Sequence, residues 1–183
     1  MNSPHPFTWL PPERHKAAFI LFLILALTVM AVMQLLGAPL VTAVAPGGIV
    51  SFELAGSLSS AQAMIASWDG RAQIYAGLGL GFDYLFMLAY AGAIGLGCVL
   101  VARRLATRLG HALAWGILLA ALLDVVENIA LIQLLLGQTA VFWPVLARWC
   151  AIPKFALVAA GLLYVLGGAV INLIRPAKPT PRR

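Results

Sequence analysis

The residues best suited to chemistry are three polar side chains that interrupt a long apolar run. Asp124, Glu127 and Asn128 are spaced i, i+3, i+4, so a helix would carry them on one face. An acidic residue in the middle of a membrane helix costs roughly 2.5–3.5 kcal/mol on insertion scales. Two acids on one helix therefore need compensation from partner groups, from water or from protonation. The pattern predicts a polar site inside an otherwise apolar bundle.

Other apolar runs carry partners for these acids. Asp83 and Tyr90, seven residues apart, share a face of one run, and Lys154 lies near the start of another. At about 1.5 Å per helical residue, all these charges fall in the outer half of a membrane, with Asp83 and Lys154 near its outer edge. We expect Lys154 to pair with an acid. The remaining carboxyls are then protonated, paired with a rim arginine, or face a cation or a wet cavity.

Two interpretations of this cluster remain open. In the first, Asp124, Glu127 and Asn128 only hydrogen-bond the bundle together, and Lys154 closes a buried ion pair. In the second, the cluster lines a pocket that binds or transforms a ligand, because ionisable groups inside membranes are commonly functional. Glu53, in a segment outside the spans, is either a lid residue of this pocket or a solvated loop residue.

Composition identifies the class of protein. Of the 183 residues, 62% are hydrophobic and only 10% are charged, whereas soluble domains have about 25% charged residues. The net charge is +6, but the positive residues flank apolar runs, a pattern typical of membrane topology signals. These features exclude a soluble enzyme, a disordered protein and a nucleic-acid-binding protein.

The expected fold is all-α, a polytopic transmembrane four-helix bundle forming one domain over residues 1–174. The predicted spans are about 17–37, 72–102, 109–136 and 150–174. The first run could also be a signal peptide, but its 21 residues favour a retained helix. Residues 175–183 are expected to form a disordered basic tail.

The segment 38–70 is broken by prolines and glycines. We expect a short amphipathic helix lying on the outer face, or an ordered loop. Ser59-x-x-Gln62 resembles a capping box, and Asp69-Gly70 a helix stop. In the next run, Gly77-x-x-x-Gly81 predicts a close contact between helices.

The positive charges predict the orientation. Nine of the twelve Lys and Arg residues lie on the side of the two termini, and three lie on the other side or near it. The positive-inside rule therefore favours N-in and C-in, with both termini cytoplasmic in a multi-pass protein of the bacterial inner membrane.

Nothing in the sequence predicts a metal or a cofactor. Cys98 and Cys150 form no closely spaced pair and are expected near opposite membrane faces. His5, His15 and His111 lie at the edges of apolar runs, where they could not hold a haem between helices. No metal site and no cofactor is therefore expected.

Spans two to four carry a recognisable pattern. Phe82-Asp83, followed by Tyr90, then Asp124-x-x-Glu127-Asn128 and a Lys-Phe start to the last span, resembles a widespread group of small bacterial four-helix membrane proteins without an assigned activity. The likeness covers roughly residues 50–170. In size and helix count the chain is also similar to the EXPERA family of sterol isomerases and sigma-2-type receptors, which use acidic residues in a membrane pocket.

The favoured hypothesis is an inner-membrane protein with an outer-leaflet pocket for a lipophilic or amphiphilic small molecule. The candidate ligand-binding or proton-handling residues are Asp83, Asp124, Glu127, Asn128, Lys154, Tyr90 and Glu53. Two carboxyls of unequal acidity could transfer a proton to such a ligand, as in isomerisation or cyclisation of a lipid. The alternatives are a proton- or cation-coupled transporter and an accessory subunit of a membrane complex. Membrane lipids are the expected partners, together with further copies of the chain or a larger complex.

Overall fold

The computed structural model describes residues 4–174, and these form helices joined by short turns and loops. The predicted basic tail lies outside the described residues. The elements are η1 (Pro12–Arg14), α1 (His15–Gly37), η2 (Ala38–Leu40), α2 (Ile49–Glu53), α3 (Leu58–Ala66), α4 (Gly70–Leu105), α5 (Leu109–Leu135) and α6 (Phe142–Ile174). In this part of the chain, four helices are long and apolar enough to cross a membrane: α1, α4, α5 and α6. The prediction of an all-helical chain with four such helices is confirmed for the described residues.

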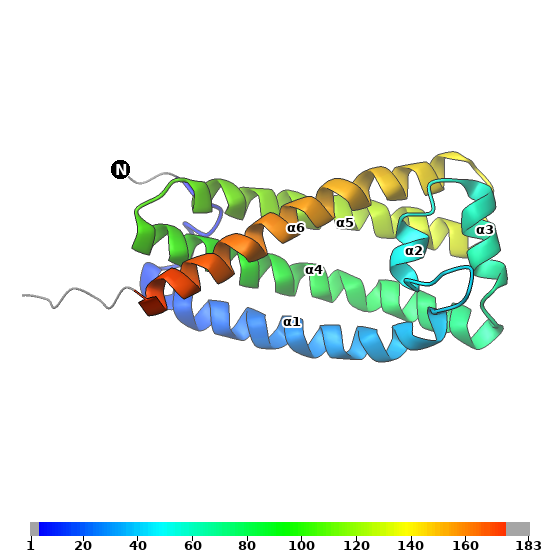
Figure 1. Cartoon of the computed structure of the whole chain (residues 1–183), viewed down its shortest axis with the longest axis horizontal. Helices are drawn as coiled ribbons and strands as arrows, with labels where there is room; N and C mark the ends of the chain where they lie inside the picture. Colours follow the sequence, from blue (N-terminus) through cyan, green and yellow to red (C-terminus); the bar gives the residue numbers. More distant parts are fainter. Residues whose placement is uncertain (1–3, 175–183) are drawn as a thin grey trace, which may run out of the picture.

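The four long helices run side by side, with α4 as the central one (Figure 1). Helix α1 packs along α4, α5 packs between α4 and α6, and α6 crosses α4 obliquely. Helices α2 and α3 cover one end of the bundle, which we call the α2–α3 end. The first turn of α1 and the last turn of α6 lie at the opposite end.

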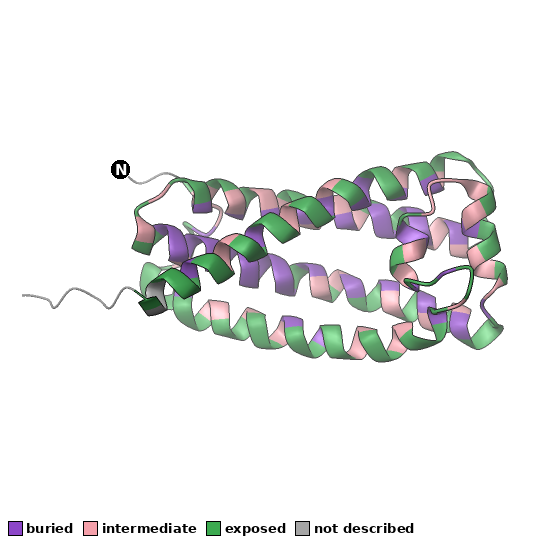
Figure 2. Ribbon diagram, viewed as in Figure 1, coloured by how far each residue is buried: buried purple, intermediate pink, exposed green. Residues whose placement is uncertain are grey.

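Burial is distributed unevenly among the helices. Buried residues concentrate on α4 and α5, whereas α1 and α6 expose most of their side chains (Figure 2). The exposed residues of α1 include large apolar ones such as Leu21, Ile24 and Leu35. Such a surface suits contact with lipid tails rather than with water.

Small residues allow the helices to approach closely. A Cβ atom added at Gly92 would meet the ring of Phe22 on α1, and one added at Gly168 would meet Val101 on α4. The predicted contact of Gly77 and Gly81 is not observed, because no described atom lies within 4 Å of a Cβ added at either position. Both glycines are exposed on the outer surface of α4.

The segment at the α2–α3 end is capped differently from the sequence expectation. Ser57, not Ser59, caps α3, since its Oγ accepts a hydrogen bond from Ser60 N at 3.2 Å. Asp69 does not end a helix but begins α4, because its carboxylate accepts from Ala72 N at 2.7 Å. Buried Trp68 ties this segment to η2 by donating its indole N–H to Leu40 O at 2.9 Å.

Helix α6 begins at Phe142, eight residues before the predicted span. Pro144 lies in its first turn, where a missing backbone N–H leaves no intrahelical bond unmade. Pro153 is therefore inside the helix rather than at its start. Lys154 consequently lies about 18 Å along the helix axis from the start of α6, and Asp83 lies about 20 Å from the start of α4.

Two apolar cores fill the bundle, and the polar cluster lies between them. The core at the α2–α3 end includes Phe52, Leu80 and Leu131, and the core at the opposite end includes Met87 and Ile117. Asp83 falls between Leu80 and Met87 along α4. The polar residues of α5 likewise fall between Ile117 and Leu131, so three helices present polar groups at one level.

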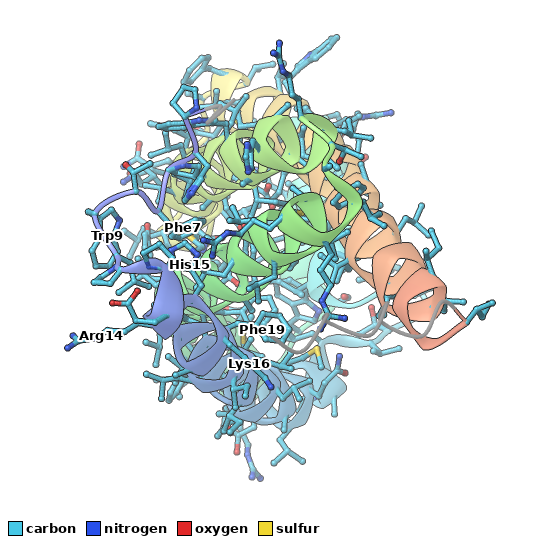
Figure 3. All side chains as sticks on the ribbon, turned by 90° about the vertical axis from the view of Figure 1, so that its left-hand side faces the viewer. Phe7, Trp9, Arg14, His15, Lys16 and Phe19 are labelled. Carbon is cyan, nitrogen blue, oxygen red and sulfur yellow. The ribbon has the colours of Figure 1, made fainter. Side chains whose placement is uncertain are left out.

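The segment before α1 folds over the end opposite α2 and α3. Phe7 and His15 point toward the helices, whereas Trp9 and Arg14 lie at the periphery (Figure 3). Buried His15 shares a hydrogen bond between its Nε2 and Leu10 O at 3.0 Å, which holds this segment against the bundle.

Candidate functional site

Lys154 of α6 is the centre of the polar cluster. Its Nζ donates to Asp124 Oδ1 at 2.9 Å and lies 2.8 Å from the Glu127 carboxylate, both on α5. Glu53 Oε2, at the end of α2, lies 3.7 Å from the same nitrogen. All four residues are buried. One lysine of α6 thus brings two carboxylates of α5 and one of the short helix α2 to a single point.

Helix α4 joins this centre through hydrogen bonds to α5. Tyr90 Oη donates to Asp124 Oδ2 at 3.0 Å, so both oxygens of that carboxylate are engaged. Asn128 Nδ2 donates to Asp83 Oδ2 at 2.8 Å and approaches Leu80 O at 3.5 Å. The polar face of α5 therefore contacts both α4 and α6.

Negative groups outnumber positive ones within the described cluster. Glu53, Asp83, Asp124 and Glu127 surround one lysine, so full ionisation would leave three uncompensated negative charges. Burial raises the pKa of Glu53, and the Asp124 carboxylate raises it further, whereas Lys154 acts in the opposite direction. The cluster can therefore hold a proton at Glu53 or receive an additional cation.

A cavity of about 690 Å³ opens beside the cluster. Its walls are α1, α4 and α6, and η2 and α2 border it at the α2–α3 end. Most of the wall is apolar, from residues such as Leu27, Met30, Val158 and Leu162. Cavities of about 300–1,000 Å³ with apolar walls and a few polar groups are typical of small-molecule sites.

The cluster contributes one side of this cavity wall. The predicted site residues that line the cavity are Glu53, Asp83, Tyr90, Asp124 and Lys154. The other two, Glu127 and Asn128, are fully buried behind the wall, between α5 and its neighbours. The structure thus brings all seven predicted residues together and separates those that face the cavity from those that support it.

Sequence reasoning missed the part of the wall that comes from α1. Met30, Met33 and Gln34 line the cavity. Gln34 could have indicated this, because it is the only amide in the apolar run 17–37. Gly79 of α4 also lines the cavity and leaves it open, since no described atom lies within 4 Å of a Cβ added there.

The structure also brings the three histidines together, at the end opposite α2 and α3. The His5 ring lies 5.6 Å from that of His15 and 5.1 Å from that of His111, measured between centroids. Over residues 4–174, however, no group of three His, Cys, Asp or Glu side chains is arranged to hold a metal ion. Cys98 and Cys150 are free, buried thiols.

The fold and the cluster define a class: a helical protein with four membrane-length helices around a buried, lysine-centred group of carboxylates. Comparison with known proteins adds no family to this description. No protein-family model, no curated protein and no solved structure matches the chain.

Proposed function

We propose that the chain is an integral membrane protein that binds an amphiphilic small molecule in the cavity between α1, α4 and α6. The observation that carries this proposal is the composition of the wall. Its polar side holds Glu53, Asp83, Asp124 and Lys154. Most of the rest is apolar, and two of the bordering helices have apolar outer faces. A ligand with a polar head and an apolar tail matches both parts of such a site.

The access route follows from the same walls. Helices α1 and α6 both pack against α4, and each contributes residues to one side of the cavity. In a bilayer, a space between two such helices faces lipid tails. A lipid-like molecule would therefore enter sideways from the membrane. Once bound, its tail would lie along α1 and its headgroup would face Glu53.

The proposed setting is a bacterial inner membrane with both termini cytoplasmic. In the described residues, the end of the bundle opposite α2 and α3 carries Arg14, Lys16, Arg103, Arg104 and Arg108, against Arg71 and Arg148 at the α2–α3 end. This imbalance supports that orientation under the positive-inside rule. The cavity, bordered by α2, then belongs to the outer leaflet.

The site is also equipped for proton transfer. Asp83 and Asp124 face the same cavity in different surroundings, since Asn128 donates to the first and Lys154 and Tyr90 donate to the second. Carboxyls in unlike environments can act as acid and base toward one ligand. Isomerisation or cyclisation of a bound lipid is the reaction type that such a pair would support.

A pair of glycine substitutions tests the binding proposal. Gly79→Leu would project a side chain into the cavity, whereas Gly77→Leu, on the same helix, would project one outward from an exposed position. The probe is hexadecylamine with a diazirine in its chain, added to the protein in phosphatidylcholine nanodiscs. We expect photolabelling of Met30 and Val158 in the wild type and in Gly77→Leu, and its loss in Gly79→Leu. Equal labelling of those residues in all three proteins would refute the proposal.

A further inference from the structure

We propose that the headgroup of the bound amphiphile is a protonated amine. This inference rests on the proposed amphiphile pocket and specifies the chemistry of its polar side. The relevant feature is which hydrogen-bonding groups of the cluster are still available to a ligand once the contacts within the protein are counted.

The lysine is already enclosed by acids, which an anionic headgroup would have to approach. An ammonium group carries three N–H donors. The Nζ of Lys154 has carboxylates of Asp124 and Glu127 at 2.9 and 2.8 Å, and Glu53 Oε2 at 3.7 Å, so three acidic side chains in the described chain surround it. A phosphate or carboxylate headgroup would meet these acids rather than a free cation.

The other donors of the cluster are engaged as well. The hydroxyl of Tyr90 donates to Asp124, and the Asn128 amide donates to Asp83 from behind the wall. Two further polar side chains of the wall, Gln34 and Tyr75, belong to the last turn of α1 and the second turn of α4. They lie toward the α2–α3 end, away from the level of Asp124.

Acceptors, by contrast, are available. Glu53 Oε2 is buried and accepts no hydrogen bond from any described residue. The whole residue is only 8% exposed, and it lines the cavity. A buried carboxylate oxygen without a donor is costly, since unmade hydrogen bonds of charged groups are expensive in a low-dielectric site. Asp83 adds a second carboxylate to the same wall.

The negative charge of the cluster distinguishes among the headgroups that can donate a hydrogen bond. The four carboxyls exceed the one lysine, so a ligand cation would reduce the imbalance, and an ammonium could donate to Glu53 and Asp83 together. An alcohol supplies one donor and no charge. An anion adds repulsion, because the one ammonium of the described cluster already has three acidic side chains around it. An amine with a single alkyl chain matches both parts of the cavity, because its chain suits the apolar wall and its ammonium suits the carboxylates of the polar side.

The test compares three competitors of equal chain length: hexadecylamine, hexadecanol and hexadecanesulfonate. Each displaces the diazirine-bearing hexadecylamine from the full-length protein in phosphatidylcholine nanodiscs, with concentrations expressed as mole fraction in the lipid. We expect the amine to compete at a concentration about tenfold lower than the alcohol, and the sulfonate to compete least. Glu53→Gln, which keeps the shape of the side chain, is expected to remove most of the advantage of the amine over the alcohol.

The outcomes separate this inference from the proposed pocket. If the alcohol or the sulfonate competes as well as the amine, and labelling still depends on Gly79, the pocket stands and the amine headgroup is wrong. If Glu53→Gln leaves the preference for the amine unchanged in a protein of wild-type thermal stability, the assignment to Glu53 is also wrong. If labelling does not depend on Gly79, both proposals fail.

Discussion

Lys154 Nζ donates to Asp124 Oδ1 at 2.9 Å, joining two residues that lie on α6 and α5 and are thirty positions apart. The same carboxylate accepts from Tyr90 of α4 through its other oxygen. The Asp124 side chain of α5 therefore links α4 and α6 to its own helix at a single level. The level lies between the two apolar cores, so the polar contacts link the helices where the apolar packing is interrupted.

Removal of the lysine is expected to destabilise the bundle strongly. Lys154→Met keeps most of the side-chain volume but leaves three buried carboxyls without their cation. Breaking a buried ion pair by removing one partner costs about 3–5 kcal/mol. The measurement is the free energy of unfolding in mixed micelles. Adding Asp124→Asn and Glu127→Gln to the same chain should restore part of the loss, whereas wild-type stability of Lys154→Met would contradict the account.

The hydrogen bond from Tyr90 contributes less. Tyr90→Phe removes one donor to Asp124, and interhelical hydrogen bonds in membranes are worth about 0.6 kcal/mol on average, with a maximum near 1.7. The matched control is Tyr84→Phe on the same helix, because the Tyr84 hydroxyl makes no hydrogen bond to the described residues. The measurement is the free energy of unfolding of both variants in the same micelles, and we expect a lower value for Tyr90→Phe than for Tyr84→Phe. Equal stability would show that the Tyr90–Asp124 bond contributes nothing.

A close helix contact makes a second test of packing. A Cβ added at Gly110 of α5 would meet the carbonyl oxygen of Cys98, the Cβ of Ala102 at 2.7 Å and the ring of Tyr164 at 2.8 Å. Overpacking of this kind costs typically about 1–3 kcal/mol. Gly110→Ala should therefore lower the thermal midpoint, whereas Gly167→Ala, with no described atom within 4 Å, should not. A Gly110→Ala protein as stable as Gly167→Ala would disprove the close approach of α4 and α5.

The docking of the segment before α1 is expected to depend on pH. Burial lowers the pKa of His5 below its usual value of 6.5, and the nearby His111, His15 and Arg103 lower it further. The docked state therefore binds a proton less readily than the undocked state, so docking weakens as the pH falls through about 6.5. A spin label at Thr8→Cys, an exposed position, should become more mobile at pH 5.5 than at pH 7.5, and a His5→Gln background should reduce this change. Mobility independent of pH would argue against the histidine contacts.

The sequence predicted the long helices because each comes from a long apolar run. It also indicated which polar residues would gather, because polar residues stand out in such runs. Asp124, Glu127 and Asn128 share a face through their spacing alone. The start of α6 was harder to predict, because Pro144 and the aromatic residues around it are as typical of a loop as of the first turn of a helix. The correct start depends on packing of this turn against α5, which the sequence pattern does not show.

The position of Glu53 required the three-dimensional structure. Its segment returns toward the bundle through Gly48, whose φ of +57° is readily available to glycine alone. Glu53 then reaches Lys154, about a hundred residues later in the chain, through a short helix without a periodic signal of its own. Local patterns carry no information on such a contact. The cavity could not be predicted for the same reason, because it depends on the divergence of α1 and α6.

The most direct test of the central claim is native mass spectrometry of the protein extracted gently from its own membranes. The account predicts a small molecule retained by the wild type and by Gly77→Leu, and absent from Gly79→Leu, whose added side chain occupies the cavity. Tandem fragmentation would then identify its headgroup and tail. The same retained mass in all three proteins, or no retained molecule in any of them, would contradict the claim that the cavity beside Lys154 is a ligand site.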